Sequence, residues 1–142
     1  MAMISKIDHL GVLVEDIDAN EALFELLGLE IGAVEHVPAF GVDIAFVRVG
    51  ESLVELVEPV DHGTDIAADL HAADDGALLH HVAYRVEDIE AQLDTLRAAD
   101  VPLADQTPRT GAGGARVAFL APEAANGVRV ELVERASDVV LD

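Results

Sequence analysis

The stretch Val14-Glu-Asp-Ile17 returns 72 residues later as Val86-Glu-Asp-Ile89, and this repetition decides how the chain is organised. The same register carries His9 onto His81. An internal repeat of this kind predicts structural units that cannot bury their apolar faces alone and stack against each other. We therefore expect two similar modules that share one core.

A second tetrapeptide supports the same division of the chain. Glu55-Leu-Val-Glu58 returns at almost the same separation as Glu131-Leu-Val-Glu134. Each predicted module therefore contributes one histidine, just before its first tetrapeptide, and one glutamate, within its second tetrapeptide. Two histidines and two glutamates have the composition of a metal site.

Composition limits the class of protein before any motif is interpreted. A chain of 142 residues with 51% hydrophobic residues is long and apolar enough for one compact domain, and is not a disordered protein. The absence of cysteine excludes a disulfide framework, thiolate ligands and a cysteine nucleophile. No apolar run reaches the roughly 18 residues needed to span a membrane, and the N-terminus lacks a signal-peptide pattern. We expect a soluble, cytoplasmic protein without membrane contact.

The charge is strongly negative. Asp and Glu number 28 against 8 Lys and Arg, which gives a net charge of −20, and Lys6 is the only lysine. Such a field repels phosphate backbones, so the sequence predicts no nucleic-acid partner. The acids are scattered along the chain, which we interpret as adaptation to high salt, where screening shortens repulsion.

Apolar periodicity and turn residues predict the order β-α-β-β-β in each module. Module one, about 5–58, has expected strands at 7–14, 31–37, 42–49 and 52–58. Its helix follows Asp16 or Asp18 and has an apolar stripe made by Ala22, Leu23, Leu26 and Leu27. Module two, about 78–135, has expected strands at 79–86, 101–106, 115–121 and 127–134 and a helix at 88–99. A connection, 59–77, carries a short helix capped by Thr64, and a peripheral tail occupies 136–142.

Strand alternation indicates which side chains converge. It places Ile7, His9, Gly11 and Leu13 on one face of their strand, and Leu79, His81, Ala83 and Arg85 on one face of the equivalent strand. Glu55 and Glu131 lie between apolar residues in mid-strand, where a carboxylate is costly to bury unless it is paired or bound to metal. The sequence therefore predicts an α+β fold, a single domain over 1–142, in which two tandem βαβββ modules form a curved mixed sheet around a central metal site.

Several of these residues are also compatible with roles unrelated to metal binding. A single strand histidine is more often a hydrogen-bonded core residue than a ligand, and only the register-matched pairs favour metal. Glu58 and Glu134 are expected to be solvated. His80 alternates away from His81 and is at best a neighbour of the ligands, while His36, His62 and His71 are expected at the surface. Arg109 is equally compatible with an anionic ligand or a surface acid. The glycine-rich stretch 110–114 lacks the setting of a phosphate loop and is expected to be a turn.

The motifs resemble a known family. Tandem βαβββ modules around a metal are typical of the vicinal oxygen chelate superfamily, which includes glyoxalase I, extradiol dioxygenases and bleomycin-resistance proteins. Within it, the chain resembles the methylmalonyl-CoA epimerases over about residues 5–135. The stretches that carry the resemblance are Ile7–Val12, Leu79–Ile89, Pro108–Pro122 and Gly127–Glu134.

The resemblance implies epimerisation of (R)- and (S)-methylmalonyl-CoA by abstraction and return of the C2 proton through a metal-stabilised enolate. It implies His9, Glu55, His81 and Glu131 as ligands of a divalent ion, with Co²⁺ favoured and Mn²⁺, Ni²⁺ or Zn²⁺ compatible, and a homodimer acting on an acyl-CoA. Glu131 is the first choice for an acid/base, and no residue is assigned to an organic cofactor. Some relatives carry a second acid at the position of Ile44, so the partner acid/base stays open.

The same residues leave three competing functions open. A lactoylglutathione lyase of the glyoxalase I type would use the same four ligands, although Pro108–Pro122 argues against it. A metal-free binding protein of the antibiotic-resistance type generally lacks the metal residues that this chain retains. An extradiol dioxygenase uses two histidines and one carboxylate, and a fourth protein ligand would crowd O₂.

Overall fold

A computed structural model describes residues 4–139. Module one contains β1 (Ile4–Val14), a 3-10 helix (Asp18–Asn20), α1 (Glu21–Leu26), β2 (Glu35–Val37), β3 (Val42–Val49) and β4 (Ser52–Pro59). The connection contains α2 (Asp65–His71). Module two contains β5 (Ala77–Val86), α3 (Ile89–Ala98), β6 (Arg109–Thr110), a 3-10 helix (Ala112–Gly114), β7 (Arg116–Phe119), a 3-10 helix (Pro122–Ala125) and β8 (Val130–Glu134).

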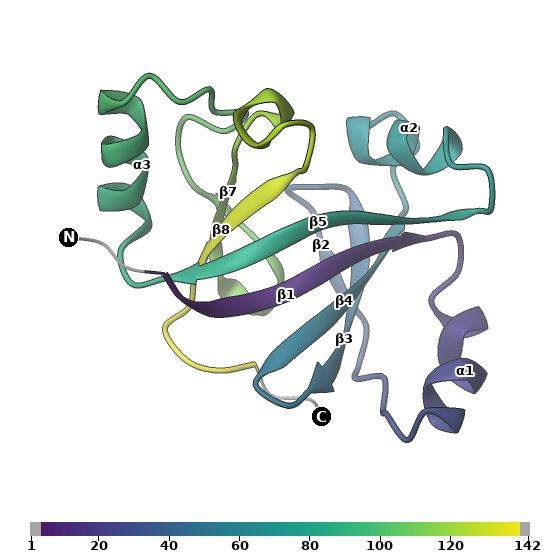
Figure 1. The fold of residues 1–142 in the computed structure, drawn as a ribbon. Coiled ribbons are helices and arrows are strands. Elements are labelled where there is room, and N and C mark those ends of the chain that lie inside the picture. The colour runs from purple at the N-terminus through teal and green to yellow at the C-terminus, as the bar shows by residue number, and fades with distance from the viewer. Residues whose placement is uncertain (1–3, 140–142) are drawn as a thin grey trace.

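The strands form one sheet in the order β2-β3-β4-β1-β5-β8-β7-β6. The two halves have the same strand arrangement, because β1 pairs in parallel with β4 just as β5 pairs in parallel with β8. The first strands of the modules, β1 and β5, run antiparallel side by side at the centre. Figure 1 shows them as the long pair across the middle, with the sheet curving away on both sides. The predicted α+β fold of tandem βαβββ modules in a curved mixed sheet is confirmed.

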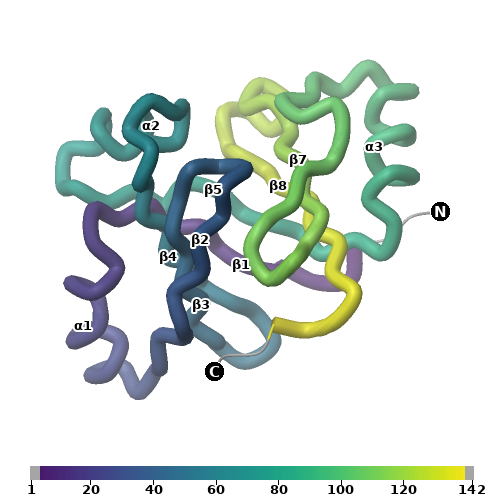
Figure 2. The backbone as a smooth tube through the Cα atoms, turned by 180° about the vertical axis from the view of Figure 1, so that it is seen from behind, coloured from purple at the N-terminus to yellow at the C-terminus, as the bar shows by residue number. Residues whose placement is uncertain are grey.

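Each module buries one face of its strands under its own helix. Residues of α3 pack with Leu132 of β8 and Ala118 of β7, and Phe24 of α1 packs against Val47 and Leu56. The opposite faces of the two halves look into the trough of the sheet, where Phe40 contacts the inner cores of both modules. Figure 2 shows from behind that α1 and α3 lie at opposite ends of the sheet. The trough is therefore the surface that both modules share.

Helix α1 departs from the expected apolar stripe. Leu23, Leu26 and Leu27 are exposed, Leu26 to 87%, and Phe24 packs on the sheet instead. Asp16 accepts a hydrogen bond from the backbone N–H of Asp18, which starts a 3-10 turn before α1 begins. In the short helix that follows, the apolar stripe predicted from the sequence faces solvent. None of the helices within residues 4–139 is long and apolar enough to cross a membrane.

Two expected strands are shorter than predicted or absent. The segment 31–37 pairs only over β2, with a single bridge from Ile31 to Val47. The segment 101–106 makes only one bridge, from Leu103 to Leu120, and the edge strand β6 lies later in the chain. Pro102 lacks a backbone N–H for a ladder, which explains why pairing does not extend through this segment.

Glu58 and Glu134 are not the solvated residues that the sequence suggested. Glu58 Oε1 accepts a hydrogen bond from the backbone N–H of Ile17 at 2.9 Å, and Glu134 Oε2 accepts one from Ile89 at 2.8 Å. The two repeated tetrapeptides therefore bind each other in both modules, the second holding the end of the first.

The chain after β8 is only partly the peripheral tail that was expected. Val139 packs against the inner core of module one, and its carbonyl accepts a hydrogen bond from Arg48 at 2.5 Å. Residues 136–139 therefore return to module one. The remainder of the expected tail, 140–142, lies outside the described residues.

Candidate metal centre

The four predicted side chains come from the four central strands. Gly11 of β1 lies between His81 on β5 and Glu55 on β4. By the symmetry of the modules, Ala83 of β5 lies between His9 on β1 and Glu131 on β8. The register therefore brings all four side chains to the trough.

Small residues make room for the imidazoles. A Cβ atom placed on Gly11 would lie 2.0 Å from His81 Cε1, so no other residue type leaves this ring in place. Ala83 is the equivalent position in module two and is fully buried. The glycine of the motif at 7–12 is thus explained by close approach of a side chain, since its backbone is ordinary β-strand.

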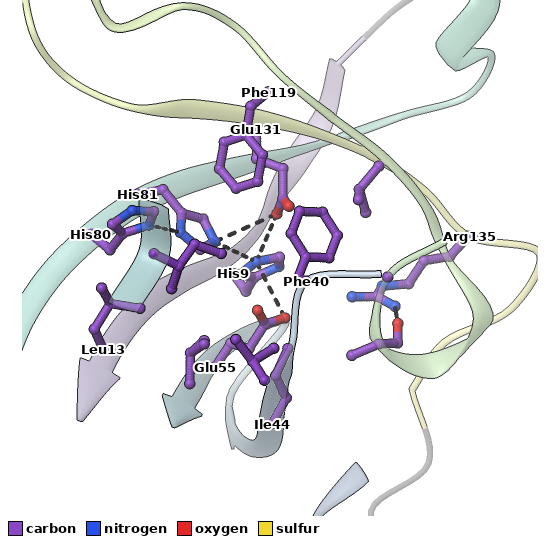
Figure 3. A pocket seen from close by; sticks show the side chains of 16 residues that line it. His9, Leu13, Phe40, Ile44, Glu55, His80, His81, Phe119, Glu131 and Arg135 are labelled. Atoms are coloured by element: carbon purple, nitrogen blue, oxygen red, sulfur yellow. Dashed lines mark hydrogen bonds and ion pairs between the residues drawn. The ribbon is translucent and has the colours of Figure 1, made fainter. Parts of the chain in front are cut away.

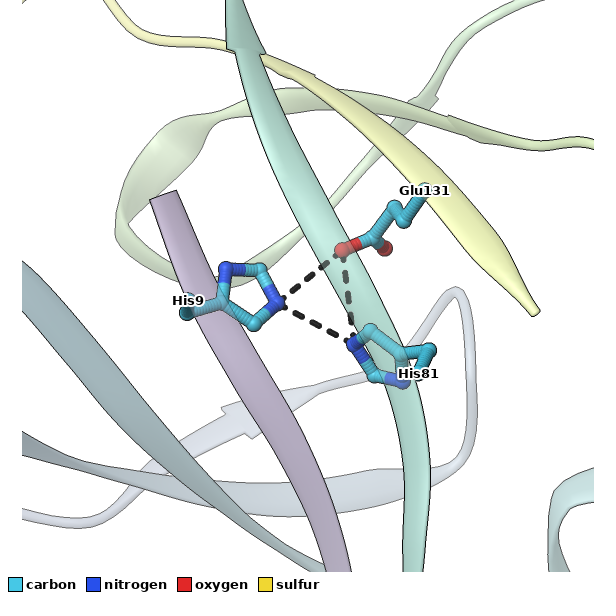
Figure 4. A group of neighbouring side chains, drawn as sticks. All are labelled: His9, His81 and Glu131. Atoms are coloured by element: carbon cyan, nitrogen blue, oxygen red, sulfur yellow. Dashed lines mark hydrogen bonds and ion pairs between the residues drawn. The ribbon is translucent and has the colours of Figure 1, made fainter. Parts of the chain in front are cut away.

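The donor atoms of the site converge closely (Figures 3 and 4). His9 Nε2 lies 3.1 Å from His81 Nε2 and 3.0 Å from Glu131 Oε1. His81 Nε2 lies 3.5 Å from the same glutamate oxygen. These three residues form a cluster that could hold a metal ion, with donor atoms within 4.8 Å of one another. Glu55 is outside this set of three, but its Oε2 lies 3.3 Å from His9 Nε2.

The chemistry of the donors fits a cation. His9 Nδ1 lies 2.7 Å from Asp8 Oδ2, an oxygen that only accepts, so Nδ1 carries the proton and Nε2 of the neutral ring carries a lone pair. Glu131 Oε1 is buried and has no hydrogen-bond partner among the described residues. Lone pairs that converge in a buried space without a donor between them repel one another, and a positive ion satisfies them together.

The titration properties of the metal-free site show the same need for positive charge. Burial alone would lower the pKa of His9, but Glu55, Asp8 and Glu131 raise it to about 10. Burial would raise the pKa of Glu131, but the neighbouring His81 and His9 lower it to about 2. Burial raises the pKa of Glu55, with His9 opposing it. Without a metal, a proton on His9 therefore supplies the compensating charge.

Three charged residues behind His9 were not identified from the sequence. Asp8 is 1% exposed and accepts hydrogen bonds from Arg85 Nε at 2.7 Å and Arg135 Nη2 at 2.9 Å. Arg135 also donates to the carbonyl oxygen of Ala112 at 3.0 Å. The two guanidinium groups and the bond to His9 hold the pKa of Asp8 far below its usual range, against the effect of burial. This buried network joins β1, β5 and the segment after β8.

The site opens on a small apolar cavity of about 30 Å³. Leu13, Ile44 and Phe119 line it beside the donors, as does Ala112 of the glycine-rich stretch. Ile44 occupies the position where some relatives are expected to carry a second acid. The adjacent Asp43 is paired with His36 at 2.9 Å and does not line the cavity. Among the described residues, the carboxylates that line it are Glu55 and Glu131.

The remaining sequence candidates lie outside the donor cluster. His62 and His71 stack on each other with ring centroids 5.5 Å apart, and both are exposed. Arg109 pairs with Asp105 at 3.2 Å and lies over the ring of Phe40. His80 contacts His81 directly and is buried, so its neighbour role is closer than alternation suggested.

Comparison with known proteins agrees with this architecture. Residues 8–119 match the model of the glyoxalase/bleomycin resistance protein/dioxygenase superfamily, to which the chain belongs. It is 37% identical over 132 residues to the ethylmalonyl-CoA/methylmalonyl-CoA epimerase of Cereibacter sphaeroides, an alignment that covers 92% of this chain and 98% of that protein. The predicted resemblance to the methylmalonyl-CoA epimerases is confirmed.

Solved structures give the same result. The methylmalonyl-CoA epimerase from Mycobacterium tuberculosis superposes with a TM-score of 0.86 at 31% identity, covering 94% of this chain and 90% of that one. A methylmalonyl-CoA epimerase in complex with methylmalonyl-CoA and NH4+ superposes with a TM-score of 0.87 at 29% identity, covering 96% and 98%. Similarity of this extent includes all four strands that carry the candidate site.

Proposed function

We propose that this protein interconverts (R)- and (S)-methylmalonyl-CoA by removing and returning the proton at C2. The observation that carries the proposal is the convergence of two imidazoles and two carboxylates from equivalent strands at a buried apolar cavity. The identity of the proposed substrate comes from relatives whose names state this activity. Their similarity extends over almost the whole chain, including the trough.

His9, His81, Glu131 and Glu55 would hold a divalent ion in this site. Mixed imidazole and carboxylate donors suit Co²⁺, Mn²⁺, Ni²⁺ or Zn²⁺, and the resemblance favours Co²⁺. When bound, the ion supplies Lewis-acid stabilisation of the negative charge that develops as the C2 proton leaves. The buried network of Asp8, Arg85 and Arg135 holds the His9 ring so that Nε2 faces the other donors.

Inversion at C2 requires proton transfer on two faces of the substrate. Glu131 is our candidate for one of these transfers, because its carboxylate lines the cavity and its Oε1 has no hydrogen-bond partner among the described residues. Glu55, the second carboxylate that lines the cavity, comes from the other module, and we assign it a ligand role only. Leu13, Ile44 and Phe119 keep the surroundings apolar, which strengthens electrostatic interactions within the site.

Deuterium exchange tests the proposed reaction. The metal-loaded protein is mixed with (R)-methylmalonyl-CoA in D₂O, and deuterium at C2 together with the (S) epimer is the expected result. Ethylmalonyl-CoA is included because the Cereibacter sphaeroides relative is named for both substrates. Absence of exchange, with turnover of the hemithioacetal of methylglyoxal and glutathione, would show a lactoylglutathione lyase instead.

Elemental analysis after dialysis tests the metal. About one equivalent of divalent metal per chain, or its recovery on reconstitution, is expected. A stable protein that retains less than about one-tenth of an equivalent and cannot be reconstituted would indicate a metal-free binding protein.

The homodimer, the cytoplasmic location and the high-salt environment stay predictions from the sequence.

A further inference from the structure

In each module, the residue directly before the proposed ligand histidine turns back to contact Nδ1 of that histidine. Asp8 Oδ2 lies 2.7 Å from His9 Nδ1. His80 Nδ1 lies 2.8 Å from His81 Nδ1, a contact drawn in Figure 3. Neighbouring residues of a regular strand point to opposite faces and do not make such contacts. Something in the backbone must therefore re-aim Asp8 and His80.

The pairing register of β1 and β5 shows how this happens. On β1, the partners of Ile7 and His9 are consecutive residues of β5, so Asp8 is an extra residue without a partner. On β5, the partners of Leu79 and His81 are consecutive residues of β1, so His80 is the extra residue there. Both residues are β-bulges, which bend a strand locally and redirect a side chain. The same device thus occurs at equivalent positions in both modules.

The hydrogen-bond directions around His80 form one consistent chain. If His81 Nε2 offers its lone pair to a metal, its proton is on Nδ1 and is donated to His80 Nδ1. His80 then carries its own proton on Nε2, which donates to Asp69 Oδ2 at 3.1 Å. The other oxygen of Asp69 accepts from Arg129 Nη2 at 3.1 Å. In each of these three contacts, a donor faces an acceptor.

We propose that His80, Asp69 and Arg129 are positioning residues that hold His81 in the metal-binding tautomer and orientation, as Asp8 does for His9. The inference rests on the proposed metal site. It also gives a purpose to α2, which carries Asp69 and connects the two modules. The backing differs in kind between the modules: His9 has a buried carboxylate held by two arginines, whereas His81 has a neutral ring backed by a carboxylate that is 27% exposed at its side chain.

Metal affinity is the first measurement. His80→Leu removes the acceptor for His81 Nδ1–H, and Co²⁺ affinity is expected to decrease about 10–100-fold. His80→Gln retains an oxygen acceptor and an N–H donor, so it is expected to recover most of that loss. His71→Leu, a change of the same kind on the exposed side of α2, is the control and is expected to retain wild-type affinity. The visible spectrum of bound Co²⁺ should change in His80→Leu and resemble wild type in His80→Gln.

The tautomers give a readout that does not depend on affinity. In the Zn²⁺-loaded protein, ¹⁵N NMR is expected to show the proton of His81 on Nδ1 and that of His80 on Nε2. Wild-type affinity in His80→Leu, equal losses in the Leu and Gln variants, or a proton on His80 Nδ1 would each overturn the inference while leaving the metal site intact. A wild-type protein that binds neither Co²⁺ nor Zn²⁺ would instead refute the metal site, and the inference with it.

Discussion

At the scale of single residues, the geometry of the site depends on positions that tolerate few other residue types. Gly11 is required because any side chain there would overlap the ring of His81. Glu131 Oε1 is buried and has no hydrogen-bond partner among the described residues, which is costly unless a cation or the proton of His9 lies beside it. Both residues predict specific consequences of substitution.

Glu131→Gln separates proton transfer from metal binding. The change keeps an oxygen donor and the volume but removes the basic oxygen, so C2 exchange should decrease about 10²–10⁴-fold, without rescue by excess Co²⁺. Glu55→Gln is the matched control, because we assign Glu55 a ligand role only, and its activity should return with added metal. Equal losses in both variants that metal does not rescue would show that the two glutamates act as paired acid/bases.

Gly11→Ala tests the close approach between β1 and His81. The new Cβ would fall 2.0 Å from His81 Cε1, so the ring must move away from the other donors. We expect a large decrease in Co²⁺ affinity and a loss of about 1–3 kcal/mol in unfolding free energy, typical of overpacking. Gly63→Ala is the control, because its Cβ would make an ordinary 3.4 Å contact. Wild-type metal affinity in Gly11→Ala would contradict this explanation of the glycine.

At the scale of elements, the repeated glutamates fasten each helix segment to its module. Glu134 accepts the backbone N–H of Ile89 at the start of α3, and Glu58 does the same for Ile17 before α1. Each pairing joins the first repeat of a module to the second. The last glutamate of the second tetrapeptide therefore makes the same contact in both modules.

Glu134→Ala should weaken the docking of α3. Leaving the N–H of Ile89 without its acceptor should cost about 1–3 kcal/mol in urea unfolding, while Glu134→Gln, which keeps an oxygen acceptor, should cost less. The exposed Glu123→Ala is expected to change stability by no more than about 0.5 kcal/mol. An effect of Glu134→Ala as small as that of Glu123→Ala would show that this hydrogen bond contributes nothing.

Elements also explain what the sequence could and could not predict. The repeat and the period of two identified the four central strands and the convergence of His9, His81 and Glu131. The alternation of side chains did not predict the positions of Asp8 and His80, because each is an extra residue inserted into its strand as a β-bulge. Residues that precede a bulge point to the face opposite to the one that alternation predicts. Ile7 and Leu79, expected on the face of the histidines, are exposed for this reason. Arg135 was missed because its partner, Asp8, is distant in sequence.

At the scale of the whole molecule, metal binding and folding stability depend on pH together. The pKa of His9 in the metal-free protein is raised from 6.5 to about 10, as the surrounding carboxylates outweigh burial. A raised pKa stabilises the folded state fully below 6.5, and that contribution is lost as pH rises through about 10. Apart from histidines, the chain contains one lysine and one tyrosine, so few other side chains titrate between pH 6.5 and 10.

Thermal unfolding between pH 6.5 and 10 measures this effect. The Tm of the metal-free protein is expected to decrease steadily over the window. The Tm of the metal-loaded protein should decrease less, because the ion replaces the proton between the carboxylates. Parallel curves with and without metal would show that the ion does not bind at His9.

The antiparallel contact between β1 and β5 has an implication for the origin of the chain. Each module holds one histidine and one glutamate of the donor set, and the register relates the two halves as equals. Two identical copies of a single module, associated through this strand pair, would present the same four donors on a symmetry axis. Fusion of two such copies into one gene would release each half to change by itself. The two modules now differ at equivalent positions, where Asp8 contacts His9 and His80 contacts His81. A symmetric pair of identical modules could not differ in this way, because both histidines would contact the same type of residue.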